Sequence, residues 1–211
     1  MKVTKYEHAC LVVEENGERL VIDPGMLAKL PELENVVAVV VTHVHPDHLH
    51  LPNLQALVGA SPGLTIFGSD EVIAELGELD VKKVSVENDM MTVGRFRLEF
   101  FGHDHAVIYQ QVPCQNRGVV VNETLYYPGD SFTLPEKPVQ DLAFPAAGPW
   151  CKVSEVADFI TAVKPQRAFP THDATLSEFG ASVNYRYIQQ AIEAGGGEFV
   201  QLKPGESLAD A

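Results

Sequence analysis

Cysteine is scarce in this sequence of 211 residues. The three cysteines, Cys10, Cys114 and Cys151, lie far apart, and none belongs to a Cys-x-x-Cys pair. This spacing excludes a disulfide framework and a thiolate zinc knuckle, so we expect reduced thiols. Long apolar runs and the apolar core of a signal peptide are also missing. We therefore expect a cytoplasmic protein that does not bind membranes.

Positive charge is scarce as well. The sequence has 15 lysines and arginines against 29 acidic residues, which gives a net charge of −14. Binding to a phosphate backbone needs a basic face, so we expect no nucleic-acid partner. Two bound dications would still permit a locally positive pocket, and the charge of a substrate stays open.

The densest chemical signal is the stretch at residues 42–50, Thr-His-Val-His-Pro-Asp-His-Leu-His. His43 and His45 can point the same way only on extended backbone, whereas Asp47 and His48 must come from a turn or a first helical turn. Imidazole nitrogens and carboxylate oxygens are ligands that borderline divalent metals such as zinc accept. The stretch therefore indicates a metal site.

The alternative is a solvated polar loop with no fold behind it. The residues just before the motif, 36–41, are Val-Val-Ala-Val-Val-Val, a β-branched run typical of a fully buried strand. Loops that carry chemistry commonly lie at the ends of such strands. This context favours the metal site over the loop.

The N-terminal region predicts a β-hairpin. Residues 2–14 alternate as a strand, and an Asn-Gly turn signal leads to a second strand at 19–22. Asp23 follows this strand, either as a turn former or as a partner of a metal-bound histidine. We favour the turn and leave Asp23 out of the site.

The rest of the chain alternates between strands and helices. Strands are expected at 36–41, 64–67, 83–86, 91–101, 118–121, 124–127, 142–144, 167–170 and 198–202, and helices at 51–58, 70–76, 153–163 and 184–194. No low-complexity linker interrupts this order, so we expect one domain over residues 1–211. Its two β-then-α units would form two sheets packed face to face, each with helices on one side.

Further candidate ligands stand at strand ends in the second half. They are His103 and His105 in Gly-His-Asp-His-Ala, Asp130 in Tyr-Pro-Gly-Asp-Ser, and His172 in Pro-Thr-His-Asp. His103 and His105 are two residues apart on the same strand side, so either one can be the ligand. Asp173 either orients the histidine before it or caps the next turn. Trp150, the only tryptophan, either lines a substrate pocket or packs in the core.

Taken in order, these signals resemble the metallo-β-lactamase superfamily of metallohydrolases. Residues 102–108, 127–131 and 147–155 are most similar to small bacterial members related to ascorbate-phosphate lactonases. The resemblance implies an α+β fold, a four-layer αββα sandwich with two β-sheets face to face and helices outside.

The resemblance also implies a ligand set for two metal ions. The first ion is bound by His43, His45 and His105, the second by Asp47, His48 and His172, and Asp130 bridges both. Asp47 and Asp130 would also be catalytic, Asp47 by orienting the attacking hydroxide. The subgroup pattern selects His105 as the ligand, and we expect His103 to contact a ligand from outside the centre or to line the pocket wall. His8 and His50 have no matching role, so we expect surface or internally satisfied side chains.

The implied activity is hydrolysis of an ester, lactone or phosphodiester bond in a small molecule, by a hydroxide that two metal ions activate. Zinc is the first expectation for both ions, with manganese or iron as alternatives. A di-iron redox protein and a metal-binding protein without turnover are the other hypotheses. All seven implied ligands are present, which favours the hydrolase. A homo-oligomer is compatible with the sequence.

Overall fold

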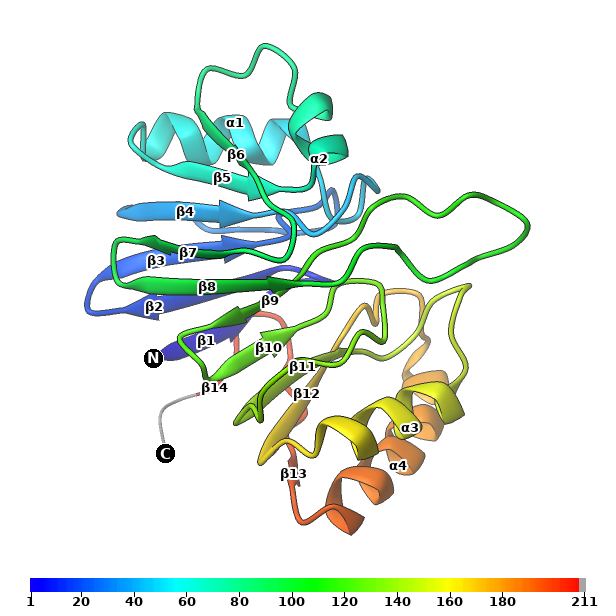
Figure 1. Ribbon diagram of the computed structural model, residues 1–211. Coiled ribbons are helices and arrows are strands. Elements are labelled where there is room, and N and C mark those ends of the chain that lie inside the picture. The colour runs from blue at the N-terminus through cyan, green and yellow to red at the C-terminus, as the bar shows by residue number, and fades with distance from the viewer. Residues whose placement is uncertain (209–211) are drawn as a thin grey trace.

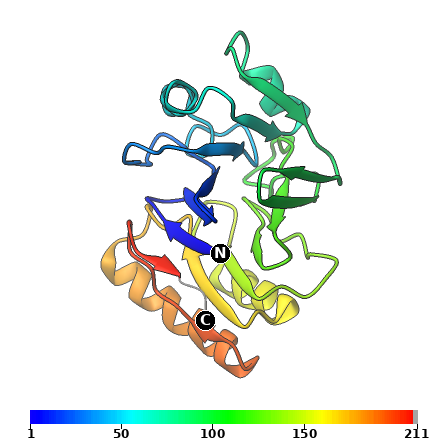
Figure 2. The ribbon, with the colours of Figure 1, turned by 90° about the vertical axis from the view of Figure 1, so that its left-hand side faces the viewer.

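The computed structural model describes residues 1–208, and they form two seven-stranded β-sheets packed face to face, with helices on both outer faces (Figures 1 and 2). The first sheet has the strand order β14 (Ser207–Leu208), β1 (Lys2–Lys5), β2 (Leu11–Glu15), β3 (Glu18–Ile22), β4 (Val36–Val40), β5 (Thr65–Gly68) and β6 (Lys82–Ser85). Helices α1 (Leu51–Ala60) and α2 (Asp70–Glu75) pack against its outer face.

The second sheet has the strand order β13 (Glu198–Phe199), β12 (Arg167–Thr171), β11 (Asp141–Pro145), β10 (Leu125–Tyr127), β9 (Gly118–Val121), β8 (Phe96–Phe101) and β7 (Met90–Val93). Helices α3 (Val153–Val163) and α4 (Glu178–Ala194) cover its outer face (Figure 1). The predicted αββα sandwich is confirmed. The domain that we predict extends to residue 211, and its last three residues lie outside the described ones.

Three apolar clusters fill the three spaces between these layers. The largest lies between the sheets and includes Leu20, Phe96 and Tyr127. A second lies between the first sheet and helices α1 and α2, and a third lies between the second sheet and helices α3 and α4. Each sheet is therefore buried on both faces, which explains why its strands read as continuous apolar runs. Within residues 1–208, no helix is both long and apolar enough to cross a bilayer.

Most predicted elements are present, and four differ. Helix α4 begins at Glu178 rather than at residue 184, because the Ser177 hydroxyl caps it by accepting a hydrogen bond from the backbone N–H of Gly180. The strand expected at 198–202 is limited to Glu198–Phe199, and β14 was not expected. The single strand expected at 91–101 is two antiparallel strands, β7 and β8.

The single strand predicted at residues 2–14 is wrong. The structure has two strands, β1 and β2, which pair with each other in antiparallel register. The turn between them is closed by a hydrogen bond of 2.8 Å from the backbone N–H of Tyr6 to the carbonyl of Cys10. Its residues, Tyr-Glu-His-Ala-Cys, include no glycine or proline, and His8 takes the left-handed conformation instead, with φ 63°. The usual sequence signal of a turn is therefore missing.

The sheet topology brings the candidate residues to one edge. Strands β3 to β6 run parallel, as do β10 to β13, so the carboxyl ends of these strands lie together within each sheet. The segment between β8 and β9 extends from the same edge and projects away from the molecule (Figure 1).

Candidate metal centre

The motif after β4 forms a turn before α1. The backbone N–H groups of His48 and Leu49 both donate to the carbonyl of His45, at 2.9 and 2.8 Å. Asp47 and His48 thus come from a turn, as predicted. The turn returns their side chains toward those of the histidines that precede it.

The first group of candidate ligands joins both sheets. It consists of His43, His45, His105 and Asp130, whose potential ligand atoms lie within 4.8 Å of one another. The Nε2 atom of His43 is 3.1 Å from Nδ1 of His45, and Nε2 of His105 is 3.2 Å from Oδ2 of Asp130. Three imidazoles and one carboxylate therefore face a common point.

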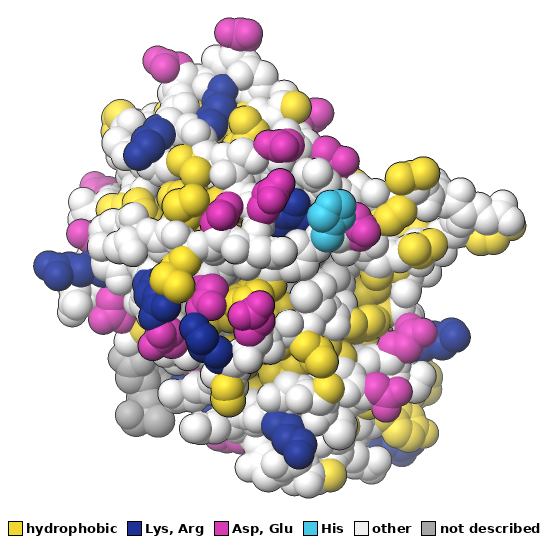
Figure 3. Space-filling view, viewed as in Figure 1, with side chains coloured by type: hydrophobic (Ala, Val, Ile, Leu, Met, Phe, Trp, Pro, Cys, Tyr) yellow, Lys and Arg dark blue, Asp and Glu magenta, His cyan; other side chains and the backbone are white. Residues whose placement is uncertain are grey.

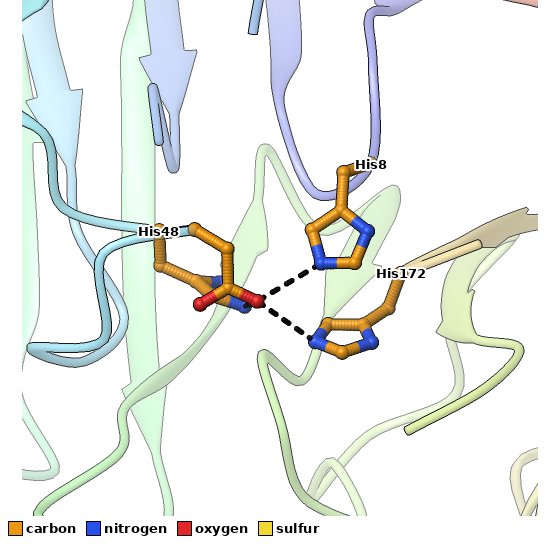
Figure 4. A group of neighbouring side chains, drawn as sticks. His8, His48 and His172 are labelled. Atoms are coloured by element: carbon orange, nitrogen blue, oxygen red, sulfur yellow. Dashed lines mark hydrogen bonds and ion pairs between the residues drawn. The ribbon is translucent and has the colours of Figure 1, made fainter. Parts of the chain in front are cut away.

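The second group adjoins the first. It consists of His8, Asp47, His48 and His172, again within 4.8 Å of one another (Figure 4). Oδ2 of Asp47 lies 3.0 Å from Nε2 of His8 and 3.4 Å from Nε2 of His172, the two contacts that are dashed in the figure. The group thus includes one residue, His8, that the sequence did not assign to the site.

Asp130 contacts both groups. Its Oδ1 atom is 3.3 Å from Nε2 of His48, and its Oδ2 atom is 2.9 Å from Nε2 of His172 as well as close to His105. The structure therefore brings together all seven residues expected as ligands, with Asp130 between the two groups.

The chemistry of the inner atoms fits metal ions. Nδ1 of His48 donates to Asp23, and the Nδ1 atoms of His105 and His172 donate to the carbonyls of Ala106 and Ala147. Each Nε2 atom is then the nitrogen that faces the centre, and without its proton it offers a lone pair to a metal ion. Among the described residues, the buried Nε2 of His48 and Oδ1 of Asp130 have no hydrogen-bond partner. Unpaired buried acceptors of this kind are costly, and a cation would satisfy them.

The electrostatics favour a cation too. Burial alone would raise the pKa of Asp130, but His48, His105 and His172 hold this pKa well below its ordinary range. Burial also opposes ionisation of Asp47, and hydrogen bonds from His172 and His8 outweigh it and lower the pKa. Both carboxyl groups are therefore anions.

His172 is the counterpart of these anions. Burial lowers its pKa, but hydrogen bonds to Asp130 and Asp47 outweigh that effect and raise the pKa to about 10. The ring is thus protonated at neutral pH in the protein alone. A metal ion that binds His172 would have to displace this proton.

Asp23 corrects one of our predictions. Its buried carboxylate accepts hydrogen bonds of 2.7 Å from the backbone and hydroxyl of Thr42 and from Nδ1 of His48. The preference for a turn former was therefore wrong, because Asp23 orients a histidine of the cluster. The two residues are 25 positions apart in the sequence, and only the pairing of β3 with β4 brings them together.

His8 is buried, with 2% of its surface exposed, and both of its ring nitrogens have hydrogen-bond partners, so of the two expectations the internally satisfied side chain is confirmed. The sequence did not predict that these contacts place His8 in the second group. By contrast, the side chain of His103 is 72% exposed and pairs with Asp104, outside both groups. The structure thus places His105 in the cluster and His103 outside it.

Trp150 and Asp173 have roles that the sequence left open. The indole Nε1 of Trp150 donates to Oδ2 of Asp130 at 3.1 Å, and the ring packs edge-on against His105 and His172. Trp150 is therefore a wall of the centre. Asp173 binds Lys5 and the hydroxyl of Tyr185, so it neither orients His172 nor caps the next turn with its side chain.

Comparison with known proteins places the chain in a family. Residues 2–172 match the Beta-lactamase superfamily domain, and the chain belongs to that superfamily. Protein Rv0786c from Mycobacterium tuberculosis is 33% identical over 192 residues, which cover 88% of this chain and 90% of that protein. A UPF0173 metal-dependent hydrolase from Carboxydothermus hydrogenoformans is 26% identical over 229 residues, with 99% of both chains covered.

Solved structures share the same architecture. Igni18, a metallo hydrolase from the archaeon Ignicoccus hospitalis, matches 98% of this chain and 97% of its own, with a TM-score of 0.75 and 20% identity. CmlA, a diiron β-hydroxylase from Streptomyces venezuelae, matches 98% of this chain but 53% of its own, with a TM-score of 0.74 and 14% identity. At these identities the likeness concerns the fold alone.

Proposed function

We propose that this protein is a metal-dependent hydrolase that binds two divalent metal ions, zinc by first expectation. The observation that carries the proposal is the meeting of two ligand groups at one buried carboxylate, Asp130. Two similar proteins support it. One relative is named a metal-dependent hydrolase, and one structural neighbour is named a metallo hydrolase.

The ligands divide as the two groups do. His43, His45 and His105 would bind the first ion, Asp47, His48 and His172 the second, and Asp130 would lie between the two ions. When bound, such ions bring the pKa of water to about 7 and polarise a carbonyl or phosphoryl oxygen. The side chain of Asp47 is 32% exposed, so a substrate would meet it, and we assign to it the orientation of the attacking water.

The chain itself fixes the bridging carboxylate. Trp150 donates to Oδ2 of Asp130, and the backbone N–H of Asp130 donates to the side chain of Asn116 at 3.0 Å. A Cβ atom at Gly148 would lie 2.7 Å from Nε1 of Trp150, so only glycine at this position allows the indole to reach the carboxylate. These contacts hold Asp130 in one orientation before any substrate arrives.

An apolar segment stands beside the centre, and we call residues 106–113 the flap. Its base is closed by a hydrogen bond of 2.9 Å from the backbone N–H of His105 to the carbonyl of Cys114. The flap has no charged residue, and Val107, Tyr109 and Val112 are 60%, 72% and 95% exposed. Figure 3 shows apolar side chains along the projecting segment. We therefore propose a small-molecule substrate with an apolar portion next to its ester, lactone or phosphodiester bond.

A di-iron redox activity is the alternative, and the fold likeness to CmlA is what supports it. The two hypotheses make different demands on the metal and on oxygen. A hydrolase works with zinc and needs no oxygen, whereas a di-iron protein is coloured and consumes oxygen.

The test begins with protein purified without chelator and analysed for metals. We expect two metal equivalents per chain and turnover of at least one class in a panel of lactones, esters, thioesters and phosphodiesters. The metal-free protein and His48→Ala serve as inactive controls. At most one equivalent after reconstitution would refute the dinuclear centre. Two zinc equivalents without turnover of any class in the panel would refute the proposed bonds, and iron with oxygen consumption would establish the alternative.

A further inference from the structure

His8 faces the second ligand group from the turn between β1 and β2. Its ring centroid lies 4.1 Å from that of His172, and its Nε2 atom lies 3.0 Å from Oδ2 of Asp47. By distance alone His8 qualifies as a fourth ligand of the second metal. The direction of its hydrogen bonds indicates a different role.

The other imidazoles share one pattern. Nδ1 of His48 faces the Asp23 carboxylate, and Nδ1 of His105 and of His172 faces a backbone carbonyl. His43 follows the same pattern: the Thr42 hydroxyl donates to Asp23 and can therefore accept from Nδ1 of His43. In all four rings Nδ1 is the donor, so Nε2 is the nitrogen that offers a lone pair to a metal once it carries no proton, as metal binding requires.

His8 has the opposite pattern. The backbone N–H of Ala174 donates to Nδ1 of His8 at 3.2 Å, and a backbone N–H is never an acceptor. The lone pair of the His8 ring is therefore on Nδ1 and the proton on Nε2. That proton points at Oδ2 of Asp47.

We infer that His8 is a positioning residue, which donates Nε2–H to Asp47 and fixes this carboxylate for the second metal without binding the metal itself. Oδ2 of Asp47 has a second lone pair, which remains available on the side of His48 and His172. The inference rests on the proposed function, because it assumes that Asp47 binds a metal ion.

The backbone supports the same arrangement. The carbonyl of His8 accepts a hydrogen bond of 3.0 Å from the backbone N–H of His172, next to the contact between Ala174 and the His8 ring. The turn of the first sheet is thus joined twice to the loop that follows β12 in the second sheet. A substitution at His8 leaves the backbone contact in place and removes the side-chain contacts.

The first experiment uses the unaltered protein loaded with zinc. Long-range nitrogen–proton NMR spectra of its imidazoles report which ring nitrogen carries a proton. We expect a protonated Nε2 and an unprotonated Nδ1 for His8, and a protonated Nδ1 with zinc-bound Nε2 for His48 and His172. An unprotonated Nε2 of His8 would overturn the inference.

The second experiment compares two variants. His8→Asn tolerates the left-handed backbone and can accept from Ala174, but it is too short to reach Asp47, whereas His8→Gln can place an N–H near Asp47. We expect His8→Asn to bind the second metal about 10- to 100-fold more weakly, as is typical for loss of an outer partner, with the first metal unchanged. His8→Gln should recover most of this affinity. Competition with a chelator measures both sites, and His103→Gln is the control.

Two results would contradict the inference. Complete loss of one metal equivalent in both variants would make His8 a ligand, and unchanged metal affinity in both would make it an ordinary buried histidine. Failure of the unaltered protein to bind two metals would instead refute the proposed function. The two failures are therefore distinguishable.

Discussion

The two ligand groups have the same size but differ in construction. In the first, the partly exposed residue is an imidazole, His45, and the carboxylate, Asp130, is 3% exposed. In the second, Asp47 is 32% exposed, and one of the three imidazoles presents a proton instead of a lone pair. The comparison teaches that proximity does not define a ligand. A histidine whose Nδ1 donates a hydrogen bond can bind a metal through Nε2. A histidine whose Nδ1 accepts one carries its proton on Nε2 and can only support a residue that binds the metal.

The largest expected effect concerns the first group. His105→Ala would leave His43, His45 and Asp130 for the first metal, which is too few for a stable site. We expect loss of about one metal equivalent and a fall in hydrolysis by orders of magnitude, measured by elemental analysis and by initial rates.

His103→Ala is the matched control, because His103 is exposed and outside both groups. We expect two bound metals and at most a small change in rate. If His103→Ala lost metal and His105→Ala kept it, the cluster would not bind metal as we assign it.

The next effect concerns the second group alone. In Asp23→Asn, an amide replaces the carboxylate oxygen that accepts from Nδ1 of His48. We expect the second metal to bind about 10- to 100-fold more weakly while the first is nearly unaffected. Chelator competition measures the two affinities. Equal weakening at both sites would remove the distinction between the groups.

The pH dependence sharpens the comparison further. Without metal, the raised pKa of His172 means that its charged form contributes stability that is complete below its ordinary pKa of about 6.5 and is lost as the pH rises to about 10. Metal binding needs the neutral ring and releases the proton. We therefore expect the rise in Tm on adding zinc to be larger at about pH 8 than at about pH 6. A rise independent of pH would contradict the coupling.

The smallest expected effect concerns the flap, which adjoins the first group through His105. Replacing Val107 and Val112 together by serine removes exposed apolar surface without changing the charge. We expect a KM several-fold higher for an apolar ester, with kcat and metal content nearly unchanged. A short-chain ester serves as the control substrate. An unchanged KM for the apolar ester would exclude the flap from substrate binding.

The sequence predicts the fold, and the candidate ligands that the structure brings together, because their signals are local. The run before His43 marks a buried strand, and four candidate ligands follow within six residues. The supporting contacts are different. Trp150 is 20 residues from Asp130, and His8 is 39 residues from Asp47, so tertiary packing alone joins them. His8 was further concealed by a turn without glycine or proline, which made residues 2–14 resemble one strand.

Three residues of the centre share an unusual backbone conformation. His8, Asp23 and His172 have φ values of 63°, 47° and 54°, in the left-handed region that disfavours side chains. Each is held there at a cost of about 1–2 kcal/mol in folding stability. His8→Gly should accordingly be about 1 kcal/mol more stable to denaturant than His8→Ala, although both lose the contact with Asp47. Selection for stability alone would replace these residues, so the centre embodies a trade-off in which activity is kept at the expense of stability.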